Sequence, residues 1–128
     1  MNSIFKLAVE LVRHSQFEPY NFVAIITDKK DRVLSIGRNS YKKTHPMQAQ
    51  YAIQDNQSEK IYLHAEIDAL VRCSKQPYKI FIARTDRHGK VRAAKPCSIC
   101  HRAIQASGIK HIYWTTDDIF KVDYERVR

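Results

Sequence analysis

Hydrophobic positions along the first third of the chain change from a helical to an extended spacing. Residues 3–15 place apolar side chains three and four positions apart, which predicts an amphipathic helix. Residues 21–27 form a short run of β-branched and aromatic side chains that is typical of a buried strand. The polar residues 28–31 predict a hairpin turn, and RVLSIG, which ends at Gly37, predicts a second strand.

The rest of the chain alternates between the same two spacings. Helices are predicted over residues 47–53, 64–74 and 97–107, and strands over residues 78–83 and 109–115. The basic segment before the last helix is compatible with a short hairpin, and the last dozen residues favour no element. Strands that alternate with helices indicate an α/β fold, in which helices cover a sheet with at least partly parallel pairing.

The length and composition predict a single domain over residues 1–128, because no repeat, low-complexity tract or linker interrupts the chain. The longest apolar run is the pentad Phe22 to Ile26, far short of the ~20 residues that span a bilayer. The N-terminal segment also lacks the pattern of a secretory signal. We therefore expect a cytoplasmic protein without a membrane partner, whose three cysteines are thiols.

The chain carries 22 lysines and arginines against 13 acidic residues, a formal net charge of +9. A positive field favours phosphate-bearing partners, although solubility alone also explains such a charge. One basic group flanks Asn39, and another leads into Pro96, so we expect both groups to form a rim around a phosphate-bearing ligand. The first group is Arg38, Lys42 and Lys43, and the second is Arg84, Arg87, Lys90, Arg92 and Lys95.

Two cysteines, Cys97 and Cys100, stand at the first turn of the last predicted helix, directly after Pro96. Proline is favoured in a first helical turn, and thiols placed there are shifted toward thiolate by the helix dipole and by free N–H groups. A Cys-x-x-Cys pair of this kind either binds a metal ion or acts as a redox dithiol. Residues 97–100 alone leave both possibilities open.

A second motif, His64-Ala65-Glu66, opens the preceding predicted helix. If the two helix N-termini lie side by side at one edge of the sheet, one imidazole and two thiolates give three ligands for zinc. Three protein ligands leave the fourth position to water, as in catalytic zinc sites, where the pKa of water falls toward ~7. Glu66 is then placed to carry a proton between water and substrate.

His-x-Glu followed by Pro-Cys-x-x-Cys is similar to the signature of the cytidine deaminase superfamily. The order of elements over residues 3–115 also resembles the core of that family, which implies a three-layer α/β/α fold with a central mixed sheet covered by helices. The resemblance implies that His64, Cys97 and Cys100 bind Zn²⁺. It also implies that Glu66 is catalytic, moving protons during hydrolytic replacement of the ring amine.

The resemblance further implies a set of substrate-binding residues. The backbone N–H of Ala65 would face the pyrimidine carbonyl, and Asn39, just after the second predicted strand, matches an asparagine that contacts the sugar in the family. His45 lies in the following polar stretch and is a further candidate for substrate contact. The remaining candidates are basic and would bind phosphate: Arg38, Lys42, Lys43 and Lys95.

Other potential ligands and stacking residues receive a different interpretation. Cys73 lies nine positions after His64 on the same predicted helix, ~13 Å along its axis, so we expect it to pack as a small apolar side chain. His101 is expected beside the site or on the surface, not on the metal. Three aromatic residues are candidates for base stacking, although core packing is the first expectation at the end of the last strand: Tyr41, Tyr51 and Trp114.

Several substrates fit the resemblance. The charge favours cytosine in single-stranded nucleic acid, DNA in particular, slightly over a free deoxycytidine nucleotide. HAEIDAL and ASGIKHIYW are loosely similar to tRNA adenosine deaminases, but Lys95 stands where those enzymes commonly have a glutamate, which counts against adenine. A non-catalytic, zinc-stabilised nucleic-acid-binding module, in which Glu66 is incidental, is the alternative from another functional class.

Overall fold

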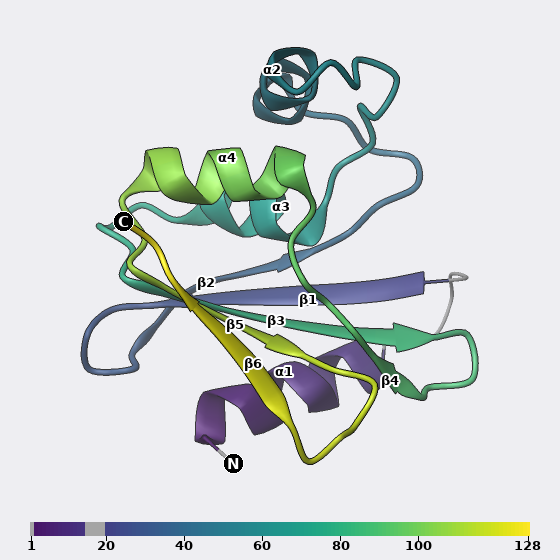
Figure 1. Cartoon of the computed structure of the whole chain (residues 1–128), viewed down its shortest axis with the longest axis vertical. Helices are drawn as coiled ribbons and strands as arrows, with labels where there is room; N and C mark the ends of the chain where they lie inside the picture. Colours follow the sequence, from purple (N-terminus) through teal and green to yellow (C-terminus); the bar gives the residue numbers. More distant parts are fainter. Residues whose placement is uncertain (1, 15–19) are drawn as a thin grey trace.

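The alternation of helical and extended spacing produces four helices and six strands within residues 2–14 and 20–128, which the computed structural model describes (Figure 1). The helices are α1 (Ser3–Arg13), α2 (Pro46–Gln54), α3 (Ala65–Arg72) and α4 (Ser98–Ser107). The strands are β1 (Tyr20–Thr27), β2 (Val33–Arg38), β3 (Lys79–Asp86), β4 (Val91–Arg92), β5 (His111–Thr115) and β6 (Val122–Arg126).

The strands form one mixed sheet in the order β2-β1-β3-β5-β6, with the short β4 paired to β3. β3 and β5 are parallel and are connected through α4, whereas the other pairs are antiparallel. The expectation of partly parallel pairing is therefore confirmed. The carboxyl ends of β2 and β3 lie on the same side of the molecule, where α3 and α4 begin (Figure 1).

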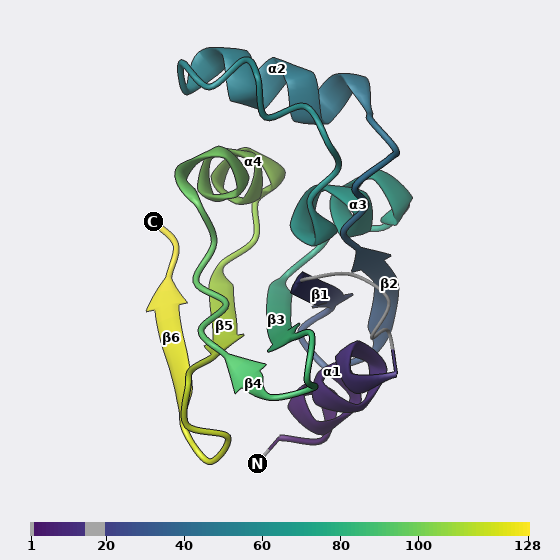
Figure 2. The ribbon, with the colours of Figure 1, turned by 90° about the vertical axis from the view of Figure 1, so that its right-hand side faces the viewer.

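Helices cover the two faces of the sheet as three layers (Figure 2). On one face, α1 buries Phe5, Ala8 and Val12 against β1 and β3. On the other face, α3 and α4 cover a core of isoleucines from β1, β3 and β5, and α2 packs outside these two helices. The three-layer α/β/α fold with a central mixed sheet is confirmed. Among the described residues, no helix has the length and apolar character needed to cross a bilayer.

Element boundaries differ from the predicted ones where tertiary pairing extends or ends an element. The predicted helix 47–53 is present as α2, and the basic segment forms the β3–β4 hairpin, which lengthens β3 to Asp86. β6 is an edge strand whose side chains are almost all solvent-exposed, and the brief alternation of Val122 and Tyr124 with acidic residues is too short to predict a strand. The predicted end of the first helix at residue 15 lies outside the described residues.

β2 approaches the first turns of α3 unusually closely at Gly37. A Cβ atom added to Gly37 would lie 2.2 Å from the carbonyl oxygen of Ala65 and 2.3 Å from the backbone nitrogen of Ala69. Both neighbours are backbone atoms, so they cannot move aside without displacing α3. The absence of a side chain at Gly37 therefore sets the distance between β2 and the helix that begins after His64.

We expect Gly37→Ala to lower the free energy of unfolding by about 3 kcal/mol, because the new methyl group overpacks a contact with helix backbone. Urea denaturation followed by circular dichroism measures this change. Val33→Ala, at an exposed position of the same strand, is the matched control and should cost less than about 1 kcal/mol. Equal stability of the Gly37→Ala protein and the wild type would contradict the close approach.

Candidate functional site

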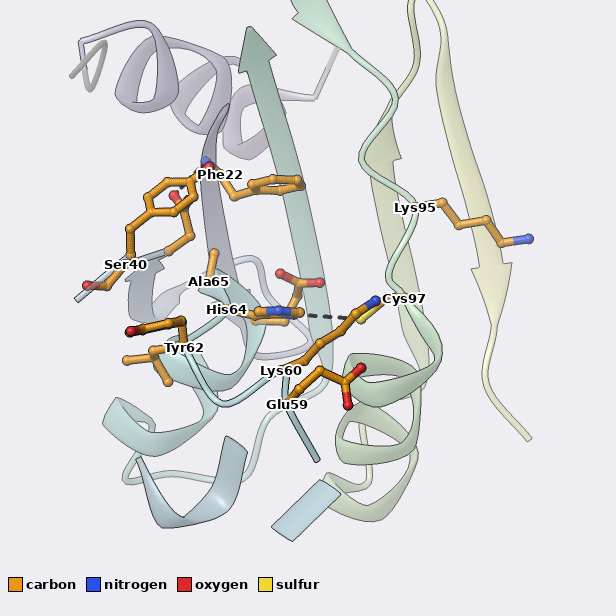
Figure 3. A pocket seen from close by; sticks show the side chains of 13 residues that line it. Phe22, Ser40, Glu59, Lys60, Tyr62, His64, Ala65, Lys95 and Cys97 are labelled. Atoms are coloured by element: carbon orange, nitrogen blue, oxygen red, sulfur yellow. Dashed lines mark hydrogen bonds between the residues drawn. The ribbon is translucent and has the colours of Figure 1, made fainter. Parts of the chain in front are cut away.

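Three potential metal ligands meet where α3 and α4 begin. His64 is the N-cap residue of α3, Cys97 is the N-cap residue of α4, and Cys100 lies in the first turn of α4. His64 Nδ1 lies 3.6 Å from Cys97 Sγ (Figure 3). It lies 3.2 Å from Cys100 Sγ, and the three ligand atoms all lie within 4.8 Å of one another. Residues 33 positions apart in the sequence thus face a common point.

The geometry and chemistry of these donors fit zinc. Zinc–nitrogen and zinc–sulfur bonds of ~2.0 and ~2.3 Å at tetrahedral angles place N and S about 3.6 Å apart, close to the two distances observed. One imidazole and two thiols are ligand types that zinc prefers, and three protein ligands are the number found in catalytic zinc sites. His64, Cys97 and Cys100 are therefore positioned to hold a zinc ion.

A buried glutamine holds the segment that carries His64. The Gln48 side chain, from α2, is fully buried; its Oε1 accepts the backbone N–H of His64 at 3.1 Å, and its Nε2 donates to the carbonyl of Lys60 at 3.2 Å. The Ser40 N–H donates to the carbonyl of Leu63 at 2.9 Å on the other side of this segment. The residue before α3 is thus fixed from two directions. Gln48 was not predicted, because a single buried polar residue leaves no periodic signal.

The start of α4 is held by the segment that follows α2. Asp55 accepts a hydrogen bond from Arg102 Nε at 2.8 Å, and its carboxylate also accepts from the hydroxyl of Ser98 and the amide of Gln57. Ser98 is the residue directly after Cys97. These hydrogen bonds lower the pKa of Asp55, and those from the Ser98 hydroxyl and the Arg102 guanidinium contribute most. The carboxylate therefore stays ionised near neutral pH.

The two cysteines share one proton unequally. A hydrogen bond from the Cys100 thiol, reinforced by His64, lowers the pKa of Cys97 to about 4. The same hydrogen bond, together with burial, raises the pKa of Cys100 well above its usual range. The hydrogen bond to Cys97 also raises the pKa of His64. The pair therefore holds a thiolate at Cys97 near neutral pH, the form in which cysteine binds metals.

Glu66 is buried beside the three ligand residues. Only 5% of the residue is exposed, and this burial raises the pKa of its carboxyl group. Charges on His64 and Cys97 also act on that carboxyl, which places it within electrostatic reach of the ligands. A carboxyl with a raised pKa can accept and return a proton near neutral pH, as a general acid–base group requires.

A cavity of about 380 Å³ opens directly above the ligands. It has the size of a small-molecule site, ~300–1,000 Å³. Four predicted site residues that are not metal ligands line it, namely Asn39, Ala65, Glu66 and Lys95. Ala65 is the first residue of α3, where a backbone N–H has no carbonyl partner within its helix and can donate to a ligand.

The cavity also has lining residues that sequence reasoning missed. Phe22, Tyr41 and Tyr62 supply aromatic walls, of which only Tyr41 was predicted to stack on a base. The Lys60 side chain crosses the mouth toward Cys97, whereas Lys95 extends away from the ligands toward β6 (Figure 3). Since Lys60 belongs to the segment that precedes α3, only the folded path of that segment reveals it.

Asn39 lines the cavity and also fixes the start of β1. Its Oδ1 accepts the N–H of Phe22 at 2.9 Å, and its Nδ2 donates to the carbonyl of Tyr20 at 3.1 Å. An asparagine amide has two N–H bonds, so the second remains for a ligand. Asn39 therefore positions Phe22 in the cavity wall, in addition to the sugar contact that was predicted for Asn39.

Four of the predicted substrate-binding residues do not line the cavity. His45 is the N-cap residue of α2, and its Nδ1 accepts the N–H of Met47 at 3.0 Å. The Arg38 guanidinium donates to the carbonyl of Leu11 in α1 at 3.4 Å, on the face of the sheet that α1 covers. Lys42 and Lys43 lie in the turn around Ser40. The polar stretch that was expected to contact substrate thus contributes mainly structural contacts.

Two of the five residues of the second basic group also make contacts away from the cavity. The Arg84 guanidinium lies 4.6 Å from the ring centroid of Tyr20 and 5.4 Å from that of Phe22, and Arg92 forms an ion pair with Asp86 at 3.2 Å. Of the cations expected to form a rim, Lys95 alone is among the residues that line the cavity, where Lys60, which was not predicted, joins it.

Two of the predicted stacking residues pack away from the cavity instead. Trp114 is 6% exposed within the core between the sheet and α4, and Tyr51 packs among α2, α3 and α4. Cys73 is partly buried against the core, as expected for an apolar role. His101 Nε2 lies 2.6 Å from Glu125 Oε2 and is absent from the ligand cluster, in agreement with its expected position outside the metal site.

Comparison with known proteins identifies a family for this chain. Residues 1–116 match the model of the cytidine and deoxycytidylate deaminase zinc-binding region. The dCMP deaminase of the cyanophage S-TIM5, solved with dCMP and dUMP, has a similar structure: TM-score 0.57 and 21% identity, covering 88% of this chain and 77% of that chain. A glutamate-to-glutamine mutant of the Mycobacterium tuberculosis cytidine deaminase gives a TM-score of 0.50 and 15% identity, covering 86% and 83%. No curated protein sequence matches the chain.

We expect the purified protein to contain about one zinc ion per chain, and the variants His64→Ala, Cys97→Ala and Cys100→Ala to lose most of it. Elemental analysis by mass spectrometry, after dialysis against a weak chelator, measures the content. Cys73→Ala removes a thiol remote from the cluster and is the matched control, which should retain zinc. Full zinc content in the Cys97→Ala and Cys100→Ala variants would show that the ion binds elsewhere.

Proposed function

The chain belongs to the cytidine and deoxycytidylate deaminase family, and we propose that it is a zinc-dependent enzyme that hydrolyses the amino group from cytosine, releasing ammonia and leaving uracil. The observation that carries this proposal is the buried Glu66, whose carboxyl has a raised pKa, at the base of a cavity beside three zinc ligands. A purely structural zinc site needs no buried carboxyl at this position. The non-catalytic module leaves the burial of Glu66 unexplained.

The residues of the cavity have separate roles in the proposed reaction. When bound, zinc supplies a Lewis acid that lowers the pKa of water and so makes a nucleophile available near neutral pH. Glu66 takes a proton from water and passes it to the ring nitrogen beside the carbon that bears the amine, while the resulting hydroxide adds to that carbon. Glu66 then takes the proton of the added hydroxyl and passes it to the amine, which leaves as ammonia as the ring carbonyl forms. The N–H of Ala65 donates to the ring carbonyl and so orients the base. Phe22 and the other walls exclude bulk water from the ring.

We propose a free deoxycytidine nucleotide as the preferred substrate, because the cavity has the size of a small-molecule site and few charges at its mouth. Lys60 crosses that mouth and is placed to pair with one phosphate group (Figure 3). The aromatic residues Tyr51 and Trp114, which favoured a polynucleotide from the sequence, are packed away from the cavity. A neighbour in fold was solved with dCMP and dUMP, which supports the same choice.

Cytosine in single-stranded nucleic acid is the second candidate substrate. The net charge of +9 favours it, since polyanions gain more than a single phosphate from a diffuse positive field. The cavity does not exclude it, because Tyr41 and Tyr62 line a mouth where a base could enter from an exposed strand.

Turnover of a substrate panel tests these assignments. The panel contains deoxycytidine, deoxycytidine monophosphate, cytosine-bearing single strands of DNA and RNA, and an adenosine-bearing RNA hairpin, with ammonia release as the readout. We expect turnover of the monophosphate to be fastest, with no ammonia from adenosine. Glu66→Gln should lower kcat by at least ~10²-fold, because the proton shuttle is lost, while zinc content stays unchanged.

Each result has a distinct consequence. Turnover confined to long strands, and falling steeply with salt, would replace the nucleotide with the polynucleotide. Unchanged turnover in Glu66→Gln, or no turnover of any substrate by the zinc-loaded protein, would refute catalysis by this site. Lys60→Ala resolves the phosphate contact: it should raise KM for the monophosphate and leave KM for deoxycytidine almost unchanged.

A further inference from the structure

The face of the sheet that carries α1 extends beyond that helix. α1 packs on β1 and β3, whereas β5 and β6 continue the sheet to its edge (Figures 1 and 2). The ligands and the catalytic cavity lie at the helix starts on the opposite face. The part of the α1 face formed by β5 and β6 therefore belongs to no site described above.

Two rows of side chains cross this part of the face. Strand register places Lys79 beside His111 and His111 beside Arg126 in the first row. In the second row, register places Phe81 beside Tyr113 and Tyr113 beside Tyr124. Alternate residues of a strand share a face, so the cationic row and the aromatic row lie next to each other on the same side of the sheet.

The last ring of the aromatic row, at the edge of the sheet, is exposed to solvent. Phe81 and Tyr113 stack with ring centroids 4.8 Å apart, and Tyr124 follows at 4.9 Å from Tyr113. Phe81 is buried beneath α1, but Tyr124 is 47% exposed. A row of rings that begins in the core and ends at an exposed ring, tilted by 47° to its neighbour, offers that last ring to a further flat group.

Hydrogen bonds hold the exposed ring in place. His111 Nδ1 lies 2.6 Å from the hydroxyl of Tyr124, and His111 Nε2 lies 3.2 Å from the hydroxyl of Tyr78. Lys29 Nζ lies 5.3 Å from the centre of the Tyr78 ring. The ring of Tyr124 is thus preorganised, so that little side-chain entropy is lost when another ring stacks on it.

The charge beside the aromatic row is predominantly positive. Burial, and then the cations Arg126 and Lys79, lower the pKa of His111. Asp31 forms an ion pair with Lys79 at 3.0 Å and neutralises its charge, so Lys29 and Arg126 provide the excess positive charge. The acidic residues of β6 alternate with Tyr124 and so face the other side, where Glu125 contacts His101 of α4.

We propose that this surface, defined by Lys79, His111, Tyr113, Tyr124 and Arg126, binds single-stranded nucleic acid. An unpaired base would stack on Tyr124, and the adjoining phosphates would pair with the excess cations Arg126 and Lys29, as in sheet surfaces that bind single strands through aromatic and basic side chains. The surface is separate from the cavity and acts independently of which cytosine substrate the cavity accepts.

A second copy of the chain fits this edge less well. Antiparallel pairing of two β6 strands about Tyr124 would place Asp123 of each opposite Glu125 of the other. Like charges directly opposite one another destabilise a strand pair. A polyanion, by contrast, meets aromatic rings and excess cations on the same side.

Binding of a short fluorescent oligothymidylate, measured by anisotropy at several salt concentrations, tests the proposal. This strand contains no cytosine, so deamination cannot alter it. We expect Tyr124→Ala to weaken binding about tenfold, and Tyr124→Phe, which keeps the ring but loses the bond to His111, to weaken it clearly less. Arg126→Ala should reduce the slope of log K against log salt by about 0.7.

Arg87→Ala removes one exposed cation from the β3–β4 turn and is the matched charge control, which should leave affinity and slope unchanged. No measurable binding, or equal affinity of Tyr124→Ala and the wild type, would overturn the proposal. A change from dimer to monomer in sedimentation of Tyr124→Ala would overturn it in favour of a second copy. Tyr124→Ala should still deaminate the free nucleotide, so failure here is distinguishable from failure of the proposed function.

Discussion

The contact between β2 and the first turns of α3 fixes where His64 stands. Because Gly37 has no side chain, the backbone of β2 lies directly against Ala65 and Ala69, and the residue before the helix is then held by Gln48. The zinc ligand therefore sits on a segment fixed by backbone contacts, not on a free loop. A shift of this helix by even an ångström would separate His64 from the two sulfur atoms of α4.

The same packing buries ionisable groups, and a bound divalent cation would stabilise their charged forms. Cys100 and Glu66 are buried, and burial disfavours the ionised form of both groups. A bound zinc ion would compensate for two thiolates at once, and Glu66 is a buried carboxyl beside the ligands that is placed to exchange a proton with a substrate. The family assignment and the local electrostatics therefore agree on a catalytic, not a structural, role for the metal.

The sequence predicted the parts of this protein in which local spacing determines structure. Amphipathic and β-branched runs gave the main helices and strands, and two short motifs at helix starts gave the ligands and Glu66. It could not predict β6, which is paired at an edge and almost entirely exposed, or Gln48 and Lys60, whose positions depend on how the segment before α3 folds back. Arg38 and His45 do not line the cavity, because residues close to Asn39 in sequence need not lie close to the cavity in the fold.

X-ray absorption at the zinc edge tests the central claim most directly, because it reports the ligands of the ion itself in solution. We predict a first shell with two sulfur atoms at about 2.3 Å and two lighter atoms, one imidazole nitrogen and one oxygen, at about 2.0–2.1 Å. A shell of four sulfur atoms, or one without sulfur, would contradict the account, because neither can be built from His64, Cys97 and Cys100.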